Sequence, residues 1–182
     1  MTKDNFFVLT GGPGMGKTSV IAALQEQGYL TVSESGREII RQQVATGGTA
    51  LPWQDQQAFA RLMFDQAIED FEQLSAQTTP VFFDRGIADT IGYLELCGLP
   101  VPDFMRQAAR RYRCNNRIFI TPPWKQIYTG DTERKQSFEE ATATYEVMVK
   151  VYQQLDYTLV HLPLDTVAAR VAFLLLEATP KD

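Results

Sequence analysis

The sequence predicts an α/β protein in which helices cover both faces of a parallel five-stranded sheet. Short apolar segments alternate along the chain with longer helical patterns, which is typical of a parallel sheet that is buried on both sides. A glycine-rich segment separates the first strand from the first helix. The chain has 182 residues, which suffice for one sizeable core, and we expect a single domain over residues 1–182.

The predicted strands are five short apolar segments. None of them alternates strictly between apolar and polar residues, as expected for strands that are covered on both faces. They span residues 6–10, 29–33, 81–84, 117–121 and 158–162.

The predicted helices lie between and after these strands. Two of them begin at the patterns Ser35-x-x-Glu38 and Ser137-x-x-Glu140, which predict capping boxes. The helices span residues 17–27, 37–46, 54–76, 88–97, 103–112, 138–155 and 166–177.

The segment "GGPGMGKT", residues 11–18, matches G-x-x-x-x-G-K-[ST] between a strand and a helix. Glycines let backbone N–H groups surround an anion at a helix N-terminus. Lys17 can reach the β- and γ-phosphates of a nucleotide, and the Thr18 hydroxyl can join a Mg²⁺ shell. A purely structural turn is the alternative. We predict a nucleotide-binding loop made of Gly11, Gly12, Pro13, Gly14, Met15, Gly16, Lys17, Thr18 and Ser19.

Charged residues follow two other predicted strands. Ligands of parallel sheets bind beyond the carboxyl ends of the strands. Glu34 and Arg37 follow the second strand, and Asp84 and Arg85 end the third. We predict that these side chains meet at the site. A surface ion pair remains the alternative for Glu34 and Arg37, a turn cap for Asp84, and a simple carboxylate partner for Arg85.

Asp84 suits two tasks. It can hold Mg²⁺ through a water molecule, or it can accept the proton of a substrate hydroxyl that attacks the γ-phosphate. Arg85 can neutralise charge on the transferred phosphate. The base-reading N-K-x-D motif of switch GTPases is absent from the sequence.

Three further features bear on a pocket. Arg134 and Lys135 lie in a polar segment before a capped helix, where a lid over the phosphates is expected at about 124–140; a solvated loop is the alternative. Trp53 follows a Gly-Gly loop and can line a substrate pocket or simply pack. His161 lies in an apolar strand, and we predict that it is packed.

The composition excludes several classes of protein. The net charge of −5 argues against a general nucleic-acid binder. Cys97 and Cys114 form no C-x-x-C pair, so neither a zinc site nor a disulfide framework is indicated. No apolar stretch approaches the ~20 residues of a membrane span, and "MTKDN" does not resemble a signal peptide. We therefore expect a cytoplasmic protein that binds no nucleic acid and does not insert into a membrane.

Several motifs occur in the order found in one family of small P-loop proteins. They are "GGPGMGKTS", "VSESGREIIRQQ", "VFFDRGIADTIGY", "IFITPPWKQIY", "DTERKQSFEEA" and "YTLVHLP". Over about residues 6–175 the chain resembles the predicted ATPases labelled AAA-type, which are similar to the kinase domain of bacterial NAD-regulator proteins, to nucleoside kinases and to an animal phosphoinositide-binding homologue. The resemblance implies a three-layer fold with strand order 2-3-1-4-5 and a lid after the fourth strand.

The resemblance also implies roles for the candidate residues. It places Glu34 and Arg37 at the substrate, Asp84 and Arg85 at the catalytic step, and Arg134 and Lys135 in the lid. Combined with the motifs described above, it gives these candidates: for catalysis Lys17, Asp84, Arg85 and Arg134, for nucleotide binding also Lys135, for substrate binding Glu34, Arg37 and Trp53, and for Mg²⁺ binding Thr18 and Asp84. Helices within 36–77 form the acceptor wall. We expect ATP-dependent (alternatively GTP-dependent) phosphoryl transfer to a nucleoside or cofactor precursor. The alternative is a regulatory protein that hydrolyses nucleotide slowly and binds an anionic phospholipid or protein partner. We expect no hexameric motor.

Overall fold

The computed structural model describes residues 1–128 and 137–179. The strands of the described chain form one sheet, in which every neighbouring pair is parallel. Their order is β2-β3-β1-β4-β5, which confirms the order implied by the resemblance. The strands are β1 (Phe6–Gly11), β2 (Leu30–Val32), β3 (Val81–Asp84), β4 (Arg117–Thr121) and β5 (Thr158–His161).

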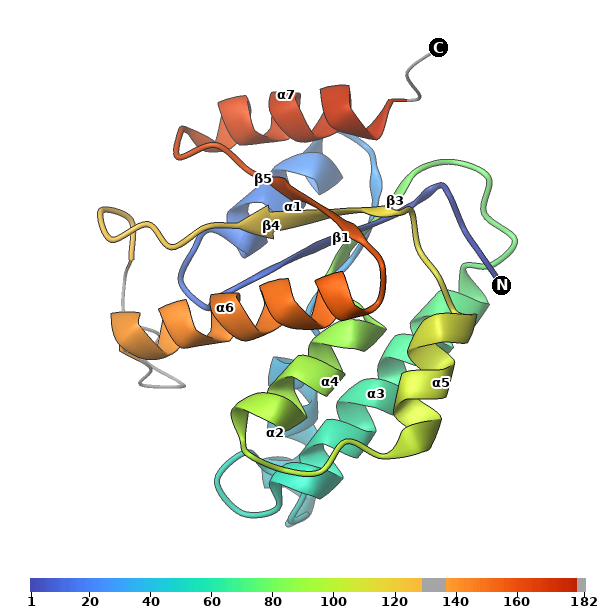
Figure 1. Cartoon of the computed structure of the whole chain (residues 1–182), viewed down its shortest axis with the longest axis vertical. Coiled ribbons are helices and arrows are strands. Elements are labelled where there is room, and N and C mark those ends of the chain that lie inside the picture. Colours follow the sequence, from blue (N-terminus) through green and yellow to red (C-terminus); the bar gives the residue numbers. More distant parts are fainter. Residues whose placement is uncertain (129–136, 180–182) are drawn as a thin grey trace.

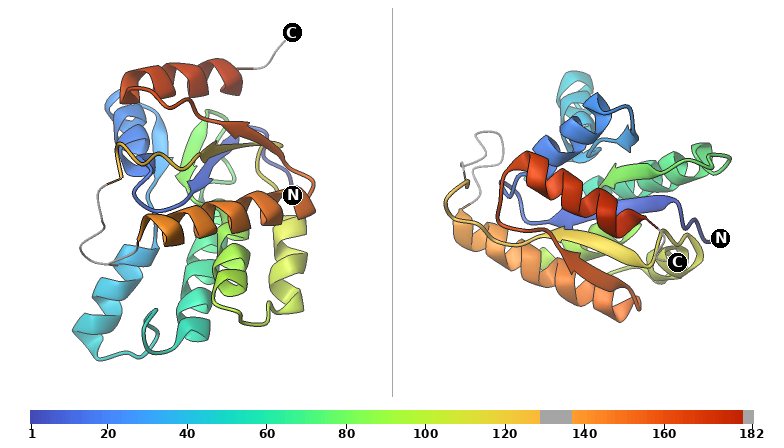
Figure 2. Two further views of the ribbon diagram at one scale, coloured as in Figure 1. Left: turned by 60° about the vertical axis from the view of Figure 1, so that its left-hand side comes forward. Right: turned by 90° about the horizontal axis from the view of Figure 1, so that it is seen from above.

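Helices cover both faces of this sheet, so the molecule has three layers (Figure 1). Helices α1 and α7 lie on one face, and α3, α4, α5 and α6 lie on the other, with α2 beside α3 (Figures 1 and 2). The helices are α1 (Lys17–Glu26), α2 (Gly36–Thr46), α3 (Gln56–Gln73), α4 (Ile87–Leu96), α5 (Asp103–Arg111), α6 (Phe138–Gln154) and α7 (Val167–Ala178).

The side chains of β1 pack into two different hydrophobic clusters, because successive side chains of a strand point to opposite faces of the sheet. Phe7 and Leu9 pack with the apolar stripes of α1 and α7, in a cluster that includes Leu24 and Leu174. Because all four of these side chains are buried, this face is closed by ordinary close packing.

The other face of β1 carries Phe6 and Val8, which belong to a larger cluster with α3, α4, α5 and α6. The Phe6 ring meets Phe71 of α3 edge-on, with ring centroids 5.0 Å apart. This second face also contains a cavity, which is described below.

The structure corrects four details of the sequence analysis. Strands β2 and β5 are partly exposed rather than covered on both faces, because they are the edges of the sheet. His161 is exposed, with its ring nitrogen 3.0 Å from the Tyr145 hydroxyl. Helix α3 begins at Gln56, because Asp55 caps it by accepting a hydrogen bond from Ala58 N. The capping box at 137–140 is confirmed, whereas the one predicted at 35–38 is wrong, because the Ser35 side chain makes no capping hydrogen bond.

Parallel pairing brings the ends of several strands to one edge of the sheet. Leu9 of β1 lies opposite Asp84 of β3, so Asp84 lies beside the start of the glycine-rich loop. Within residues 1–128 and 137–179, no helix is long and apolar enough to cross a membrane.

Candidate active site

The glycine-rich loop lies between β1 and α1, as predicted. Gly11, Gly14 and Gly16 have φ angles of 128°, 69° and 80°, which side chains with a Cβ rarely adopt. The glycines are therefore required by the backbone path of the loop. Thr18 and Ser19, at the start of α1, are exposed beside it, so their hydroxyls are accessible to a ligand.

Two glycines also let the loop approach neighbouring elements closely. A Cβ on Gly12 would lie 2.2 Å from the carbonyl oxygen of Ala141 in α6, and one on Gly11 would lie 2.3 Å from Thr121 Oγ1 in β4. The start of the loop is therefore packed directly against β4 and α6. Thr121 Oγ1 also donates to Thr10 O over 3.2 Å.

A buried arginine of α7, Arg170, donates a hydrogen bond to the backbone of the loop. The sequence analysis did not single it out. Arg170 of α7 is 1% exposed, and its Nη1 donates to Met15 O over 3.0 Å while its Nε donates to Pro163 O over 2.9 Å. Burial lowers the pKa of this guanidinium. Its central carbon lies 5.5 Å from the centre of the Trp124 ring. A lone arginine in the apolar stretch "VAARVAFLLL" was the signal available in the sequence.

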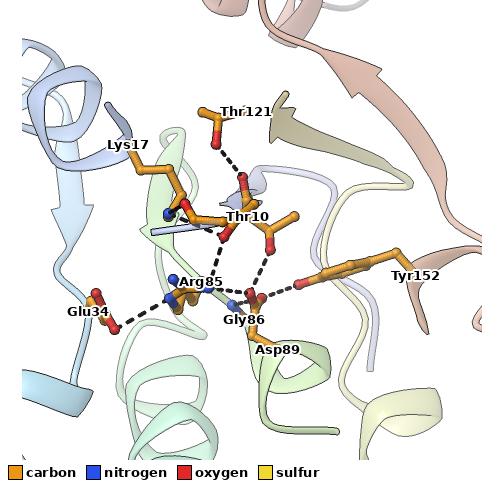
Figure 3. A network of polar contacts seen from close by, with 10 residues as sticks. Thr10, Lys17, Glu34, Arg85, Gly86, Asp89, Thr121 and Tyr152 are labelled. Carbon is orange, nitrogen blue, oxygen red and sulfur yellow. Dashed lines mark hydrogen bonds and ion pairs between the residues drawn. The ribbon is translucent and has the colours of Figure 1, made fainter. Parts of the chain in front are cut away.

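Lys17 lies inside the loop, where its side chain is buried. Its Nζ donates to Gly12 O over 2.7 Å and to Gly11 O over 3.3 Å (Figure 3). Burial, together with the positive charge of Arg85, lowers the pKa of Lys17 to about 8. The Lys17 ammonium therefore lies at the loop in surroundings that disfavour its positive charge. The negative charge of a bound polyphosphate would stabilise it there.

Asp84 ends β3 as a buried carboxylate with an unused acceptor. Its side chain is 5% exposed, and Oδ1 has no hydrogen-bond partner in the described part of the chain. Burial raises the pKa of Asp84, while the charges of Lys17 and Arg85 oppose that rise. Because a buried carboxylate oxygen without a partner is costly, it is a strong indication of a functional group.

Arg85 has a left-handed backbone, with φ of 77°, which is unusual for a residue other than glycine. Its N–H donates to Leu9 O over 2.9 Å, which extends the β1–β3 ladder by one bond. Strain of this kind persists only where the surrounding structure enforces it, and it occurs often at functional sites.

The Arg85 side chain is fixed by partners on both sides (Figure 3). Nε lies 3.4 Å from Glu34 Oε1, and Nη1 lies 3.2 Å from Asp89 Oδ1 and 3.3 Å from Gly11 O. Burial opposes the charged form, but Glu34 and Asp89 raise the pKa of Arg85 above its usual range. The guanidinium is therefore charged and immobilised beside the first glycine of the loop.

Asp89 of α4 organises this cluster, and sequence reasoning did not single it out. Its carboxylate accepts hydrogen bonds from Thr10 Oγ1 over 2.5 Å, from the Tyr152 hydroxyl over 2.7 Å and from Gly86 N over 2.8 Å (Figure 3). Asp89 thus connects β1, α4 and α6 to Arg85. Its place one helical turn after Arg85 was the sequence signal for an i, i+4 ion pair.

A cavity of about 320 Å³ opens beside Asp84 and Arg85. Its lining includes Pro13 of the loop, Glu34, and side chains of α3, α4 and α6. Trp53 also lines the cavity but is 64% exposed, so it lies at the rim. Pockets of this size bind small molecules, with a few polar groups fixing their orientation.

The remaining predicted residues lie elsewhere or outside the described residues. Arg37 is exposed on α2 and is not among the residues that line the cavity. Arg134 and Lys135 lie outside the described residues, and so does the centre of the segment predicted as a lid. The structure thus brings together Glu34, Asp84 and Arg85 with the glycine-rich loop.

The oxygen ligands near the loop fit a magnesium ion that keeps most of its water. The described residues contain no group of three or more His, Cys, Asp or Glu side chains that could form a protein cage for a metal. Mg²⁺ typically binds one or two protein oxygens beside substrate phosphates. The accessible Thr18 hydroxyl and the unpaired Oδ1 of Asp84 provide this kind of donor set.

Comparison with known proteins places the chain in a family. A family model described as "AAA domain" matches residues 6–170. The chain belongs to this AAA domain family. No curated protein matches it in sequence.

Solved structures similar to this AAA domain include two kinases and the NadR protein. A deoxyadenosine kinase from M. mycoides is 12% identical, with a TM-score of 0.68 over 94% of this chain and 97% of that one. Thymidylate kinase from Ehrlichia chaffeensis is 15% identical, with a TM-score of 0.66 over 98% and 99%. The NadR protein in complex with NR is 20% identical, with a TM-score of 0.66 over 97% of this chain and 50% of that one. This chain therefore has the P-loop nucleoside-kinase fold and spans about half of the NadR protein.

Proposed function

We propose that this protein transfers the γ-phosphoryl group of ATP to a hydroxyl group of a small molecule. The observation that carries the proposal is the position of Asp84. Its buried carboxylate, with the unpaired Oδ1, lies between the glycine-rich loop and the cavity. A base at that boundary can take the proton of an acceptor hydroxyl in the cavity while the hydroxyl oxygen attacks a phosphate in the loop.

The loop is the nucleotide half of the proposed site. Backbone N–H groups of residues 14–18 surround the phosphates, and Lys17 contributes a cation that is already desolvated by burial. Thr18 would hold Mg²⁺ directly and Asp84 through a water molecule, and the ion would supply charge neutralisation at the phosphates. Arg170 stabilises the backbone of the loop through its hydrogen bond to Met15 O.

The cavity is the acceptor half. Asp84 accepts the proton of the acceptor hydroxyl while the new O–P bond forms and the bond between the γ-phosphorus and the β-phosphate oxygen breaks. ADP and the phosphorylated acceptor are the products. Arg85, held by Glu34 and Asp89, stabilises negative charge on the transferred group without having to reorganise.

The fold relatives are consistent with transfer to a small molecule. Besides the deoxyadenosine and thymidylate kinases, they include a shikimate kinase in complex with shikimate, with a TM-score of 0.54 and 18% identity. A regulatory nucleotide-binding protein is the competing function. It needs no acceptor cavity, so the cavity beside Asp84 favours the kinase.

Asp84→Asn tests the proposal, because it removes the charge and preserves the shape. We expect phosphoryl transfer to fall by about 10²-fold or more, the usual scale of general-base catalysis, while ATP affinity changes little. Asp65→Asn is the matched control, since Asp65 pairs with Arg61 on the exposed face of α3. If Asp84→Asn only weakens Mg²⁺-dependent ATP binding, and no acceptor stimulates ATP consumption by the natural protein, the regulatory function replaces the kinase.

The lid remains a prediction about residues 124–140. Arg134→Ala and Lys135→Ala should each lower turnover, because cations that close over the triphosphate stabilise the transferred charge. Unchanged turnover in the double variant would remove the lid from the proposal.

A further inference from the structure

The walls of the cavity are mostly apolar away from the glycine-rich loop. Aromatic and sulfur-containing side chains of α3, α4 and α6 belong to this surface, and Trp53 lies at its rim. They include Trp53, Phe59, Met63, Phe71, Tyr93 and Met148. Such walls bind a ligand through the apolar area that it removes from water.

The cavity also extends along the sheet away from the phosphate loop. Its lining runs from Asp84, at the carboxyl end of β3, past Phe83 and Val8 in the middle of the sheet. It reaches Cys114, which precedes the amino end of β4. A ligand whose hydroxyl lies at Asp84 would therefore place its body along this apolar length.

The charges in the lining are unfavourable for an anion. Arg85 is the one cation among the described residues that line the cavity, and Glu34, Asp89 and Gly11 O hold it at the end of the cavity beside the glycine-rich loop. The lining contains further carboxylates in Asp84 and Asp70. An anionic group placed beside the apolar walls would lose its water without gaining a counter-ion from the described residues of the lining.

Asp70 makes this bias strongest at the far part of the cavity. It lies on α3 next to Phe71, where its Oδ1 accepts a hydrogen bond from Gln66 over 2.9 Å. Burial raises the pKa of Asp70, the Gln66 hydrogen bond opposes that rise, and the negative charge of Glu69 adds to it. Its carboxylate can accept a hydrogen bond from a neutral ligand, but it repels an anionic one.

We propose that the acceptor is an uncharged alcohol of about the size of a nucleoside, with an aromatic or other apolar body. Its hydroxyl lies at Asp84 and its body lies against α3 and α4. The inference rests on the proposed function and narrows it. Of the acceptor chemistries that occur with this fold, it selects uncharged nucleoside-like molecules over nucleoside monophosphates and hydroxy acids.

The direct test is binding to the full chain in the presence of saturating ADP–Mg²⁺, which occupies the loop. Matched probes are thymidine with thymidine 5′-monophosphate, adenosine with adenosine 5′-monophosphate, and 3-phenylpropanol with 3-phenylpropionate. We expect at least one neutral member to raise the melting temperature, and its anionic partner to bind about tenfold more weakly or worse. Equal or tighter binding of the anions would overturn the inference, and so would the failure of all neutral members to bind.

A charge variant tests the cause of the discrimination. Asp70→Asn removes the distal carboxylate and should reduce the preference for the neutral member of a pair about threefold or more, because it removes repulsion of the anion. Asp65→Asn is the control, since Asp65 lies on the same helix but does not line the cavity. An unchanged preference in Asp70→Asn would contradict the proposed origin of the discrimination.

A volume variant tests where the body of the acceptor lies. Ala67 lines the cavity on α3, whereas Ala58 on the same helix does not. Ala67→Phe should abolish binding of the neutral probe and leave ADP–Mg²⁺ binding intact, while Ala58→Phe should preserve both. Unaltered probe binding in Ala67→Phe would contradict the location.

The outcomes separate the inference from the proposed function. If neutral probes bind at this cavity but never receive phosphate, the inferred ligand class is supported and the proposed kinase activity is contradicted. If the anionic probes are phosphorylated in preference to the neutral ones, the proposed kinase activity is supported and the inferred ligand class is contradicted.

Discussion

The two halves of the proposed site are built in different ways. The glycine-rich loop uses consecutive residues and backbone groups, and its shape depends on glycines whose Cβ would collide with β4 and α6. The cavity instead collects side chains from β1, β3, α3, α4 and α6, which are distant in the sequence. A phosphate is the same in every substrate, so a local motif suffices to bind it, whereas a particular acceptor needs a shape that only tertiary packing provides.

The largest effect should come from Lys17 in the loop. Lys17→Ala removes the buried cation that faces the polyphosphate, and we expect turnover to fall about 10²- to 10³-fold, as for other preorganised charge-stabilising donors. Calorimetry with ATP–Mg²⁺ should show a parallel loss of affinity. Lys150→Ala, which removes an exposed partner of Glu95, is the control. Unchanged binding and turnover in Lys17→Ala would show that the loop is not a nucleotide site.

The hydrogen bond from Arg170 to Met15 O in the loop should contribute to the stability of the protein. Arg170→Met keeps much of the volume but leaves Met15 O without its donor, so we expect a loss of about 1–3 kcal/mol in the free energy of unfolding. Arg61→Met, which removes an exposed ion pair with Asp65, should cost only about 0.5 kcal/mol. Chemical denaturation measures both variants. Equal losses of unfolding free energy in Arg170→Met and Arg61→Met would show that the buried hydrogen bonds of Arg170 stabilise the protein no more than an exposed ion pair does.

Asp89 lies at the boundary of the two halves and acts through Arg85. Asp89→Asn removes one of the charges that fix the guanidinium, and we expect kcat to fall about tenfold, equivalent to ~1.4 kcal/mol of activation free energy. Tyr152→Phe removes only the hydroxyl that donates to Asp89 and should have a smaller effect. Steady-state kinetics should show lower kcat with little change in the KM for ATP. A change confined to the KM for ATP would place Asp89 in the nucleotide half instead.

The smallest effect should occur at the cavity rim. Trp53 is 64% exposed, so Trp53→Ala removes apolar area only at the mouth of the acceptor half. We expect the KM for the acceptor to rise several-fold while the KM for ATP is unchanged. A change in the KM for ATP alone would show that Trp53 contacts the nucleotide.

The same contrast explains which features were predictable from the sequence. The loop and the buried strand β1 were predicted because their signals are local. Asp89 and Arg170 were not singled out as site residues, because their partners Thr10 and Met15 lie 79 and 155 residues away in the chain. The exposure of His161 depends on the edge position of β5, which an apolar pattern alone does not reveal. Sequence could place Glu34, Asp84 and Arg85 at strand ends, but the cavity required the packing of α3, α4 and α6.

The most direct measurement follows the label of [γ-³²P]ATP during incubation with the protein, Mg²⁺ and a neutral acceptor that binds the cavity. If the loop and the cavity are two halves of one transfer site, the label appears on the acceptor, and Asp84→Asn reduces that transfer about 10²-fold or more. If the label appears only as inorganic phosphate, at a rate that the acceptor does not change, the two halves do not form a kinase site.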